Sequence, residues 1–388
     1  MPRARPLAAL LLALAPALAR ADDLAADLEA IRAKHGLPAL GAALVRVDAP
    51  ETDVRVAVTG TRRAVDPAHP GDAPPPVTPD DPWHLGSCTK AMTATLCARL
   101  VERGKLRWTS TLAEVFPEGR DRMDPGWRGV TLRQLLAHRA GAPPDMDRDG
   151  LWARLWQDDG PRPEQRLRAV RVLTGAPPSP APGTAFVYSN AGYLIAGAMC
   201  ERVMGRTWDD LMGEEVWGPL GIRSAGTGAP GDPAAKGAPD APRGHRRQGD
   251  AWAPVEPGPG SDNPPAIGPA GTVHMDLADW GRFVAAHLRG ARGEPPAPGA
   301  RPYLARATWA ELHRPEGAER YALGWGCPER DWARGPALTH AGSNTMWYAV
   351  VWAAPARGFA ALVVTNAGGE AAPKACDEAA QAVLRRAP

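Results

Sequence analysis

The chain has 388 residues, a length that suits one large domain or two closely packed ones. Its 45 Lys and Arg residues nearly balance its 43 Asp and Glu residues, and the basic residues are scattered rather than clustered. That distribution argues against nucleic acid as a partner. The five cysteines form an odd, widely spaced set, so they do not indicate a disulfide framework, and the sequence leaves open whether any of them pair.

Residues 1–21 have the features of a secretory signal peptide. Arg3 and Arg5 form a basic start, residues 7–18 form an apolar run, and residues 19–21 fit an A-x-A cleavage site. The apolar run is too short to span a bilayer, and no later run is long enough. We therefore expect the mature chain, residues 22–388, to be exported to the periplasm or the medium as a soluble protein without a membrane span.

Strand-like runs lie at both ends of the mature chain, and helical patterns fill its middle. Runs rich in β-branched residues predict strands at 41–47, 54–60, 321–325, 347–353 and 359–365. Periodicity and end signals predict helices at 24–35, 89–104, 131–138, 166–173, 192–204, 207–216, 275–288 and 374–385. Stretches rich in Pro, Gly and Ala indicate loops or insertions at 71–82, 174–183, 221–260 and 290–302. Keeping strands apart from helices favours an α+β fold, with one sheet assembled from both ends of the chain.

Ser87 and Lys90 stand three residues apart at the start of the helix expected over 89–104. That spacing puts two side chains on neighbouring positions of a helix, so the Lys90 amine can reach the Ser87 hydroxyl. A serine hydroxyl becomes a good nucleophile when a base takes its proton. Lysine can be that base if burial or a nearby cation lowers its pKa. Taken alone, the spacing also fits a serine helix cap followed by a solvated lysine.

Two later clusters carry further chemistry. Tyr188 and Asn190 lie in a turn before a helix, where a phenol can relay protons and an amide can donate to a carbonyl. The alternative is an asparagine cap beside a core tyrosine. His340 is followed by Ala341 and Gly342, small residues that let backbone approach a ligand. The alternative there is a strand end with a hydrogen-bonded histidine.

Other catalytic patterns are missing from the sequence. It contains no G-x-S-x-G serine elbow, no H-E-x-x-H metal motif and no phosphate-binding Gly-Lys loop. Its nine histidines show no metal-ligand spacing. We therefore expect neither a metal nor a cofactor.

The motifs Ser87-x-x-Lys90, Tyr188-Ser189-Asn190 and His340-Ala341-Gly342 resemble, in order and spacing, those of serine β-lactamase-like hydrolases. The similar branch includes class C β-lactamase relatives, D-alanyl-D-alanine peptidases and esterases. Flanking segments also match, and the resemblance runs from about Leu24 to the C-terminus; these segments are 100–106, 131–141, 217–221 and 321–325.

The resemblance implies a fold in which an antiparallel sheet is flanked by helices and an all-helical subdomain is added, with the active site between them. For this chain it places the sheet part at about 22–90 and 264–388. The helical part then covers about 91–263.

The resemblance also implies catalytic roles. Ser87 would form an acyl-enzyme, and Lys90 and Tyr188 would together take its proton and protonate the leaving group. Asn190 would hold Lys90 and the substrate carbonyl, while His340 would sit behind Tyr188 and tune it. The backbone N–H groups of Ser87 and Ser343 would form the oxyanion hole. His138, in one of the matching segments, is expected to be structural.

For substrate binding the resemblance implies Ala341, Gly342, Asn344 and Trp325, with core packing as the alternative for Trp325. Ala341 departs from the threonine often found there, whose hydroxyl helps bind a substrate carboxylate, and residues 343–346 replace a usual glycine. The expected partner is a small-molecule ester, with a D-alanyl-D-alanine peptide or a β-lactam as alternatives. An alternative from another functional class is a non-catalytic penicillin-sensing or peptidoglycan-binding module. The oligomeric state is left open.

Overall fold

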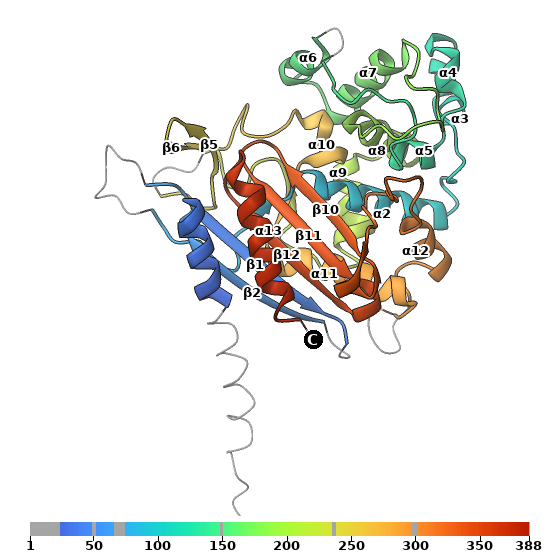
Figure 1. The fold of residues 1–388 in the computed structure, drawn as a ribbon. Coiled ribbons are helices and arrows are strands. Elements are labelled where there is room, and N and C mark those ends of the chain that lie inside the picture. Colours follow the sequence, from blue (N-terminus) through green and yellow to red (C-terminus); the bar gives the residue numbers. More distant parts are fainter. Residues whose placement is uncertain are drawn as a thin grey trace, which may run out of the picture.

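The computed structural model describes residues 24–48, 52–65, 74–147, 150–234, 238–295 and 301–387. Its centre is a five-stranded antiparallel sheet with the strand order β10-β11-β12-β1-β2 (Figure 1). These strands are β1 (Ala39–Arg46), β2 (Asp53–Gly60), β10 (Leu338–Ser343), β11 (Tyr348–Ala354) and β12 (Phe359–Thr365). The N-terminal hairpin therefore pairs with the C-terminal strands through β1 and β12, which confirms the prediction of one sheet built from both ends.

Helices cover both faces of this sheet (Figure 1). A helix over residues 24–35 and α13 (Ala371–Leu384) pack on one face, where Leu28, Leu40 and Val363 share a buried cluster. On the other face α11 (Leu277–Arg292) contacts β1, β2 and β12. Because both faces are covered, β12 is buried along its whole length, and its sequence is nearly continuous in apolar residues.

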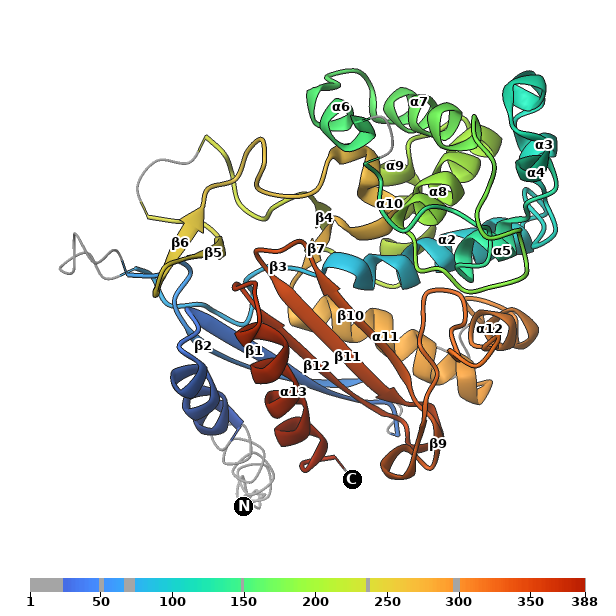
Figure 2. The same ribbon diagram turned by 45° about the horizontal axis from the view of Figure 1, so that its top comes forward.

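The remaining helices gather beyond the β10 edge of the sheet (Figure 2). They are α2 (Thr89–Glu102), α3 (Leu112–Val115), α4 (Pro125–Arg128), α5 (Leu132–Leu136), α6 (Leu151–Gln157), α7 (Arg162–Thr174), α8 (Asn190–Met204), α9 (Trp208–Met212), α10 (Gly268–Gly271) and α12 (Arg306–Leu312). Short 3-10 turns are η1 (Gly86–Cys88), η2 (Pro117–Arg122), η5 (Pro265–Ile267), η6 (Asp331–Ala333) and η7 (Pro355–Arg357), and η4 (Gly213–Trp217) is a π-helical turn. The fold is thus the expected α+β type, whereas the residue boundaries of a sheet part and a helical part stay a prediction.

One expectation for local structure is wrong, and one is incomplete. The segment 321–325 is not a strand, because Gly324 adopts a left-handed φ of +83° and passes so close to α2 that a Cβ would lie 2.6 Å from the Ala91 Cα. The segment 221–260 is not only loop. It holds a short strand and a hairpin whose exposed residues lack an alternating apolar pattern. The small strands are β3 (Trp83–His84), β4 (Gly226–Thr227), β5 (Gly244–Gln248), β6 (Ala251–Val255), β7 (Val273–Met275), β8 (Glu329–Arg330) and β9 (Gly335–Pro336).

The expected signal peptide at 1–21 lies outside the described residues. Within the part that the structure describes, every helix is too short or too polar to cross a bilayer. All five cysteines are buried free thiols, and Cys97 and Cys200 are the pair in contact, with their sulfur atoms 3.5 Å apart.

Candidate active site

Two glycines bring the serine and the third motif together. Gly86 precedes Ser87 in η1 and has a φ of +50°, and a Cβ there would lie 2.7 Å from the carbonyl carbon of Gly342. A Cβ on Gly342 would in turn lie 2.6 Å from Ser87 N and still closer to Leu85 O. Such separations are too short for any side chain, so both positions require glycine. Ser87 therefore lies against the end of β10, although the two segments are far apart in the sequence.

Lys90 is buried at the start of α2 and points its amine at Ser87. Its Nζ donates to Ser87 Oγ at 2.9 Å, to Asn190 Oδ1 at 2.8 Å and to the carbonyl of Ala270 at 2.7 Å. Desolvation lowers the pKa of this amine from 10.5 to about 7. The contact that the Ser87–Lys90 spacing predicts is present, and the reading of Lys90 as a solvated lysine is wrong because the residue is 0% exposed.

The second motif approaches from the start of α8. Asn190 is the first residue of that helix, Ser189 is its cap, and the Lys90 amine reaches both the Asn190 amide and the face of the Tyr188 ring, 4.9 Å away. Although 37% of Tyr188 is exposed, desolvation of its phenol raises the pKa above the usual value, and the favourable interaction with the Ser87 side chain only partly opposes this.

His138 holds the second motif in place. Its Nδ1 accepts from Ser189 N at 3.1 Å, its carbonyl accepts from Val187 N at 2.8 Å, and its ring lies 4.3 Å from that of Tyr188. Burial keeps the pKa of this imidazole well below its ordinary value. His138 thus supports the Tyr188 turn through backbone contacts and packing.

His340 lies beside Tyr188, with ring centroids 6.2 Å apart, but its nitrogens contact other groups. Nδ1 meets the carbonyl of Ala341 at 2.6 Å, which makes Nδ1 the protonated nitrogen, and Nε2 meets the hydroxyl of Tyr321 at 3.0 Å. Desolvation, followed by the charge of Lys90, lowers the pKa of His340 to about 3. The imidazole is therefore neutral, and its role in tuning Tyr188 stays a prediction.

The residues expected to bind substrate differ in exposure. Ala341 and Ser343 are exposed at the end of β10, whereas Gly342 is buried against η1. Trp325 was expected to bind substrate, but it is 1% exposed and packs on the His287 ring at 5.0 Å, so it belongs to the core. The Asn344 side chain is also turned inward, and its amide contacts Asp262 and Met346 N instead of facing a substrate.

Sequence reasoning missed two partners of the site. The carbonyl of Ala270 accepts from Lys90, and a backbone acceptor carries no side-chain signal that could reveal it. Tyr321, the partner of His340, lies in a flanking segment that matches the family, and that match was the available signal. Among the described residues, no group of three or more His, Cys, Asp and Glu side chains is placed to hold a metal ion.

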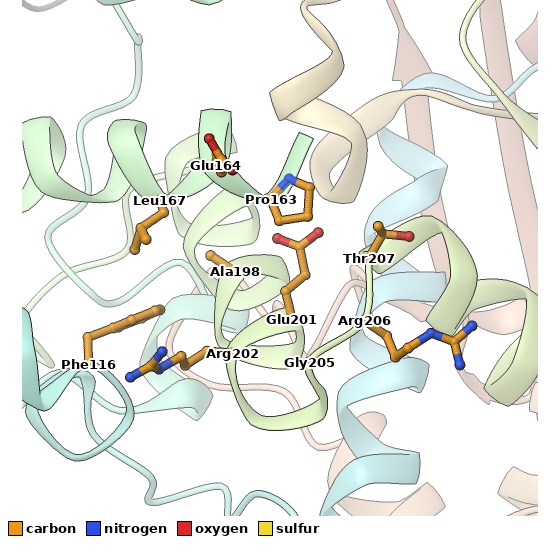
Figure 3. A pocket seen from close by; sticks show the side chains of 10 residues that line it. All are labelled: Phe116, Pro163, Glu164, Leu167, Ala198, Glu201, Arg202, Gly205, Arg206 and Thr207. Carbon is orange, nitrogen blue, oxygen red and sulfur yellow. The ribbon is translucent and has the colours of Figure 1, made fainter. Parts of the chain in front are cut away.

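A separate cavity of about 280 Å³ lies between α7 and α8 (Figure 3). The cavity borders the C-terminal half of α8, whereas Asn190, which contacts Lys90, lies at the N-terminal end of that helix. The charged groups on its wall are paired, since Arg202 contacts Glu118 and Glu201 contacts Arg166. Nothing at this cavity brings a nucleophile and a base together.

Known penicillin-binding proteins and esterases are similar to this chain. The family model described as Beta-lactamase matches residues 25–385. Penicillin-binding protein 4 of Amycolatopsis lactamdurans is 29% identical over 305 residues, which are 75% of this chain and 74% of that protein. Esterase EstB of Burkholderia gladioli is 32% identical over 163 residues, which cover 39% of this chain and 40% of EstB. The crystal structure of SurE matches with a TM-score of 0.71 and 25% identity, covering 95% of this chain and 76% of that one.

Proposed function

The chain belongs to the beta-lactamase family of serine hydrolases, and we propose that it cleaves an ester or amide bond through an acyl-enzyme formed on Ser87. The observation that carries this proposal is the 2.9 Å contact between Lys90 Nζ and Ser87 Oγ, together with the pKa of about 7 that burial imposes on Lys90. A general base is most effective when its pKa lies near the working pH. The proposed chemistry uses no cofactor.

Lys90 is the base in this proposal, and Tyr188 is the proton donor. The neutral amine takes the Ser87 proton as Oγ attacks the carbonyl carbon, and Asn190 Oδ1 and the Ala270 carbonyl then hold the ammonium. The raised pKa of Tyr188 keeps its phenol protonated, so the phenol can protonate the leaving group. The Lys90 ammonium returns a proton to the phenolate. Water attacks the acyl-enzyme with the same groups in reverse order.

The backbone N–H groups of Ser87 and Ser343 form the oxyanion hole in this proposal. The close packing of Gly86 against Gly342 and of Gly342 against Ser87 N supports it, because it brings the two amides to one junction. Donors of this kind are worth roughly a hundredfold or more in rate.

Ala341 makes a neutral ester the favoured substrate class. The residue is exposed at the site but has no hydroxyl with which to bind a substrate carboxylate. A hydrogen bond to a charged group contributes about 1.5–3 kcal/mol, which corresponds to roughly ten- to a hundredfold in kcat/KM. Penicillins, cephalosporins and D-alanyl-D-alanine peptides carry that carboxylate, whereas an aryl acetate does not.

The test compares kcat/KM for an aryl acetate, a chromogenic cephalosporin and a D-alanyl-D-alanine peptide on wild type and Ala341→Thr. Wild type should prefer the aryl acetate, and Ala341→Thr should improve the two carboxylate-bearing substrates selectively. A wild-type preference for the cephalosporin or the peptide would instead favour a β-lactamase or a D-alanyl-D-alanine carboxypeptidase. Stable acylation by penicillin without turnover of any of the three would favour the penicillin-sensing module.

Export is a separate part of the proposal. It is supported by the basic start, apolar run and A-x-A site within residues 1–21. N-terminal sequencing of the protein recovered from the periplasm or medium should begin at Asp22. An intact N-terminus on protein confined to the cytoplasm would contradict export.

A further inference from the structure

One buried carboxylate contacts both segments that meet at the active site. Asp262 lies just before η5, and its side chain is 7% exposed. Its Oδ2 meets His84 Nε2 at 2.8 Å, and its Oδ1 accepts from Asn344 Nδ2 at 2.9 Å. Both carboxylate oxygens therefore bind side chains from other parts of the chain.

The His84 arm leads to the serine. His84 lies on β3, is 0% exposed, and accepts the N–H of Gly86 on its Nδ1 at 3.1 Å. Because Nδ1 is an acceptor, Nε2 carries the proton that is donated to Asp262. Asp262 thereby fixes the tautomer in which His84 can hold Gly86, the residue directly before Ser87.

The Asn344 arm leads to the other proposed oxyanion donor. Asn344 follows Ser343 at the end of β10, and its Oδ1 accepts from Met346 N at 3.2 Å. With its Nδ2 bound to Asp262, this side chain ties the turn after Ser343 to the same carboxylate.

The residue next to Asp262 reaches the third side of the site. Asn263 donates its Nδ2 to the carbonyl of Gly271 at 3.1 Å, and the preceding carbonyl, that of Ala270, accepts from Lys90. Asp262 therefore contacts His84, beside the nucleophile, and Asn344, beside the proposed oxyanion donor Ser343. The next residue, Asn263, contacts the backbone segment that accepts from the base Lys90.

We propose that Asp262 is a positioning residue that sets the geometry of the oxyanion hole through His84 and Asn344. The inference rests on the proposed function, because it assigns the oxyanion hole to the N–H groups of Ser87 and Ser343. Such donors act only when they aim at the position where the oxyanion forms. A small displacement of either segment should therefore slow catalysis without changing ground-state binding.

The test replaces Asp262 by asparagine, whose NH₂ group would face an N–H donor at one of the two positions where a carboxylate oxygen accepts a hydrogen bond in wild type. The expected result is a fall in kcat for an aryl acetate of roughly ten- to a hundredfold with an almost unchanged KM, since the donors are displaced rather than removed. An alkyl boronic acid, which forms a tetrahedral adduct with the serine, should lose affinity by a similar factor. The double variant Asp262→Asn/Asn344→Asp restores the hydrogen bond between the two positions and should recover part of the lost kcat.

Asp279→Asn is the matched control. Asp279 is also a buried carboxylate that accepts backbone N–H groups, those of Arg223 and Ser224, but it lies outside the site. The Asp279→Asn variant should have a lower Tm and an unchanged kcat. If Asp262→Asn fails to fold, Asn344→Ala removes one arm alone and should lower kcat with KM retained.

Two outcomes would overturn the proposal. One is a folded Asp262→Asn or Asn344→Ala protein with wild-type kcat and wild-type boronic acid affinity. The other is a fall in activity of Asp262→Asn that is fully accounted for by a smaller fraction of folded protein. Ser87→Ala, assayed beside these variants, separates failure of the proposed function from failure of the positioning role. If Ser87→Ala retains activity, the proposed function itself is wrong. If Ser87→Ala is inactive and Asp262→Asn is fully active, only the positioning role is rejected.

Discussion

Replacing Lys90 by arginine keeps a positive charge beside Ser87 but removes the proposed base. The wild-type amine has a pKa lowered to about 7 by burial, so it is protonated below that pH and cannot accept the serine proton. Activity should therefore rise with pH through about 7 and then level off. Arginine stays protonated throughout this range, so Lys90→Arg should lose that rise together with most of its activity.

The magnitude follows from the same pKa. At about pH 5, two units below the pKa of Lys90, roughly one amine in a hundred is neutral, and wild-type kcat/KM should fall to about one hundredth of its plateau. Loss of general-base catalysis in Lys90→Arg should cost roughly 10²–10⁴-fold at the plateau.

The assay is kcat/KM for a neutral aryl acetate from about pH 5 to about pH 9, with the released phenol separated by chromatography and quantified at one fixed pH, so that its own ionisation does not enter. Lys105→Arg is the control, because Lys105 is an exposed lysine just beyond the end of α2. It should keep the wild-type profile. A Lys90→Arg enzyme with more than about a tenth of wild-type kcat/KM, or a wild-type profile that stays flat across pH 7, would refute Lys90 as the base.

Three further predictions concern the same site. Tyr188→Phe keeps the ring contact with His138 but removes the hydroxyl at Ser87, so kcat should fall by roughly 10²-fold or more with little change in Tm; wild-type kcat would contradict a proton-donor role. Gly342→Ala places a methyl 2.6 Å from Ser87 N and should lower both Tm and the acylation rate, whereas Gly129→Ala, where an added Cβ meets nothing within 4 Å, should do neither. Because folding lowers the pKa of Lys90 from 10.5 to about 7, the unfolded chain binds more protons between these values. The free energy of unfolding, measured with denaturant, should therefore rise across this pH range by about 1.4 kcal/mol per pH unit in wild type relative to Lys90→Met. Equal changes with pH in the two proteins would contradict the lowered pKa of Lys90.

Continuous apolar patterns made much of the fold predictable. β12 was predicted from its run of apolar residues, all of which are buried, whereas α2 was predicted from its periodicity and the glycine that follows it. The hairpin of β5 and β6 could not be foreseen, since its exposed residues leave no periodic signal. The segment around Gly324 resembled a strand, and only its contact with α2 explains the left-handed turn.

The site was predictable to the extent that it is built from local motifs. The spacing of Ser87 and Lys90 indicated their contact, and the family resemblance implied that Asn190 would hold Lys90; both contacts are present in the structure. The Ala270 carbonyl and Asp262 could not be found in this way, because their contacts depend on how distant segments pack. Trp325 was misplaced for a related reason: a residue type does not tell whether a side chain faces a pocket or the core.

The central claim, a covalent acyl-enzyme on Ser87, is tested most directly by intact-mass analysis after exposure to a fluorophosphonate, a penicillin and a chromogenic ester, with the adduct mapped to a peptide. Wild type should gain one fluorophosphonate adduct on the peptide that contains Ser87, and a folded Ser87→Ala protein should gain none and lose ester turnover. An adduct on another residue, or ester hydrolysis well above background by folded Ser87→Ala, would contradict the account.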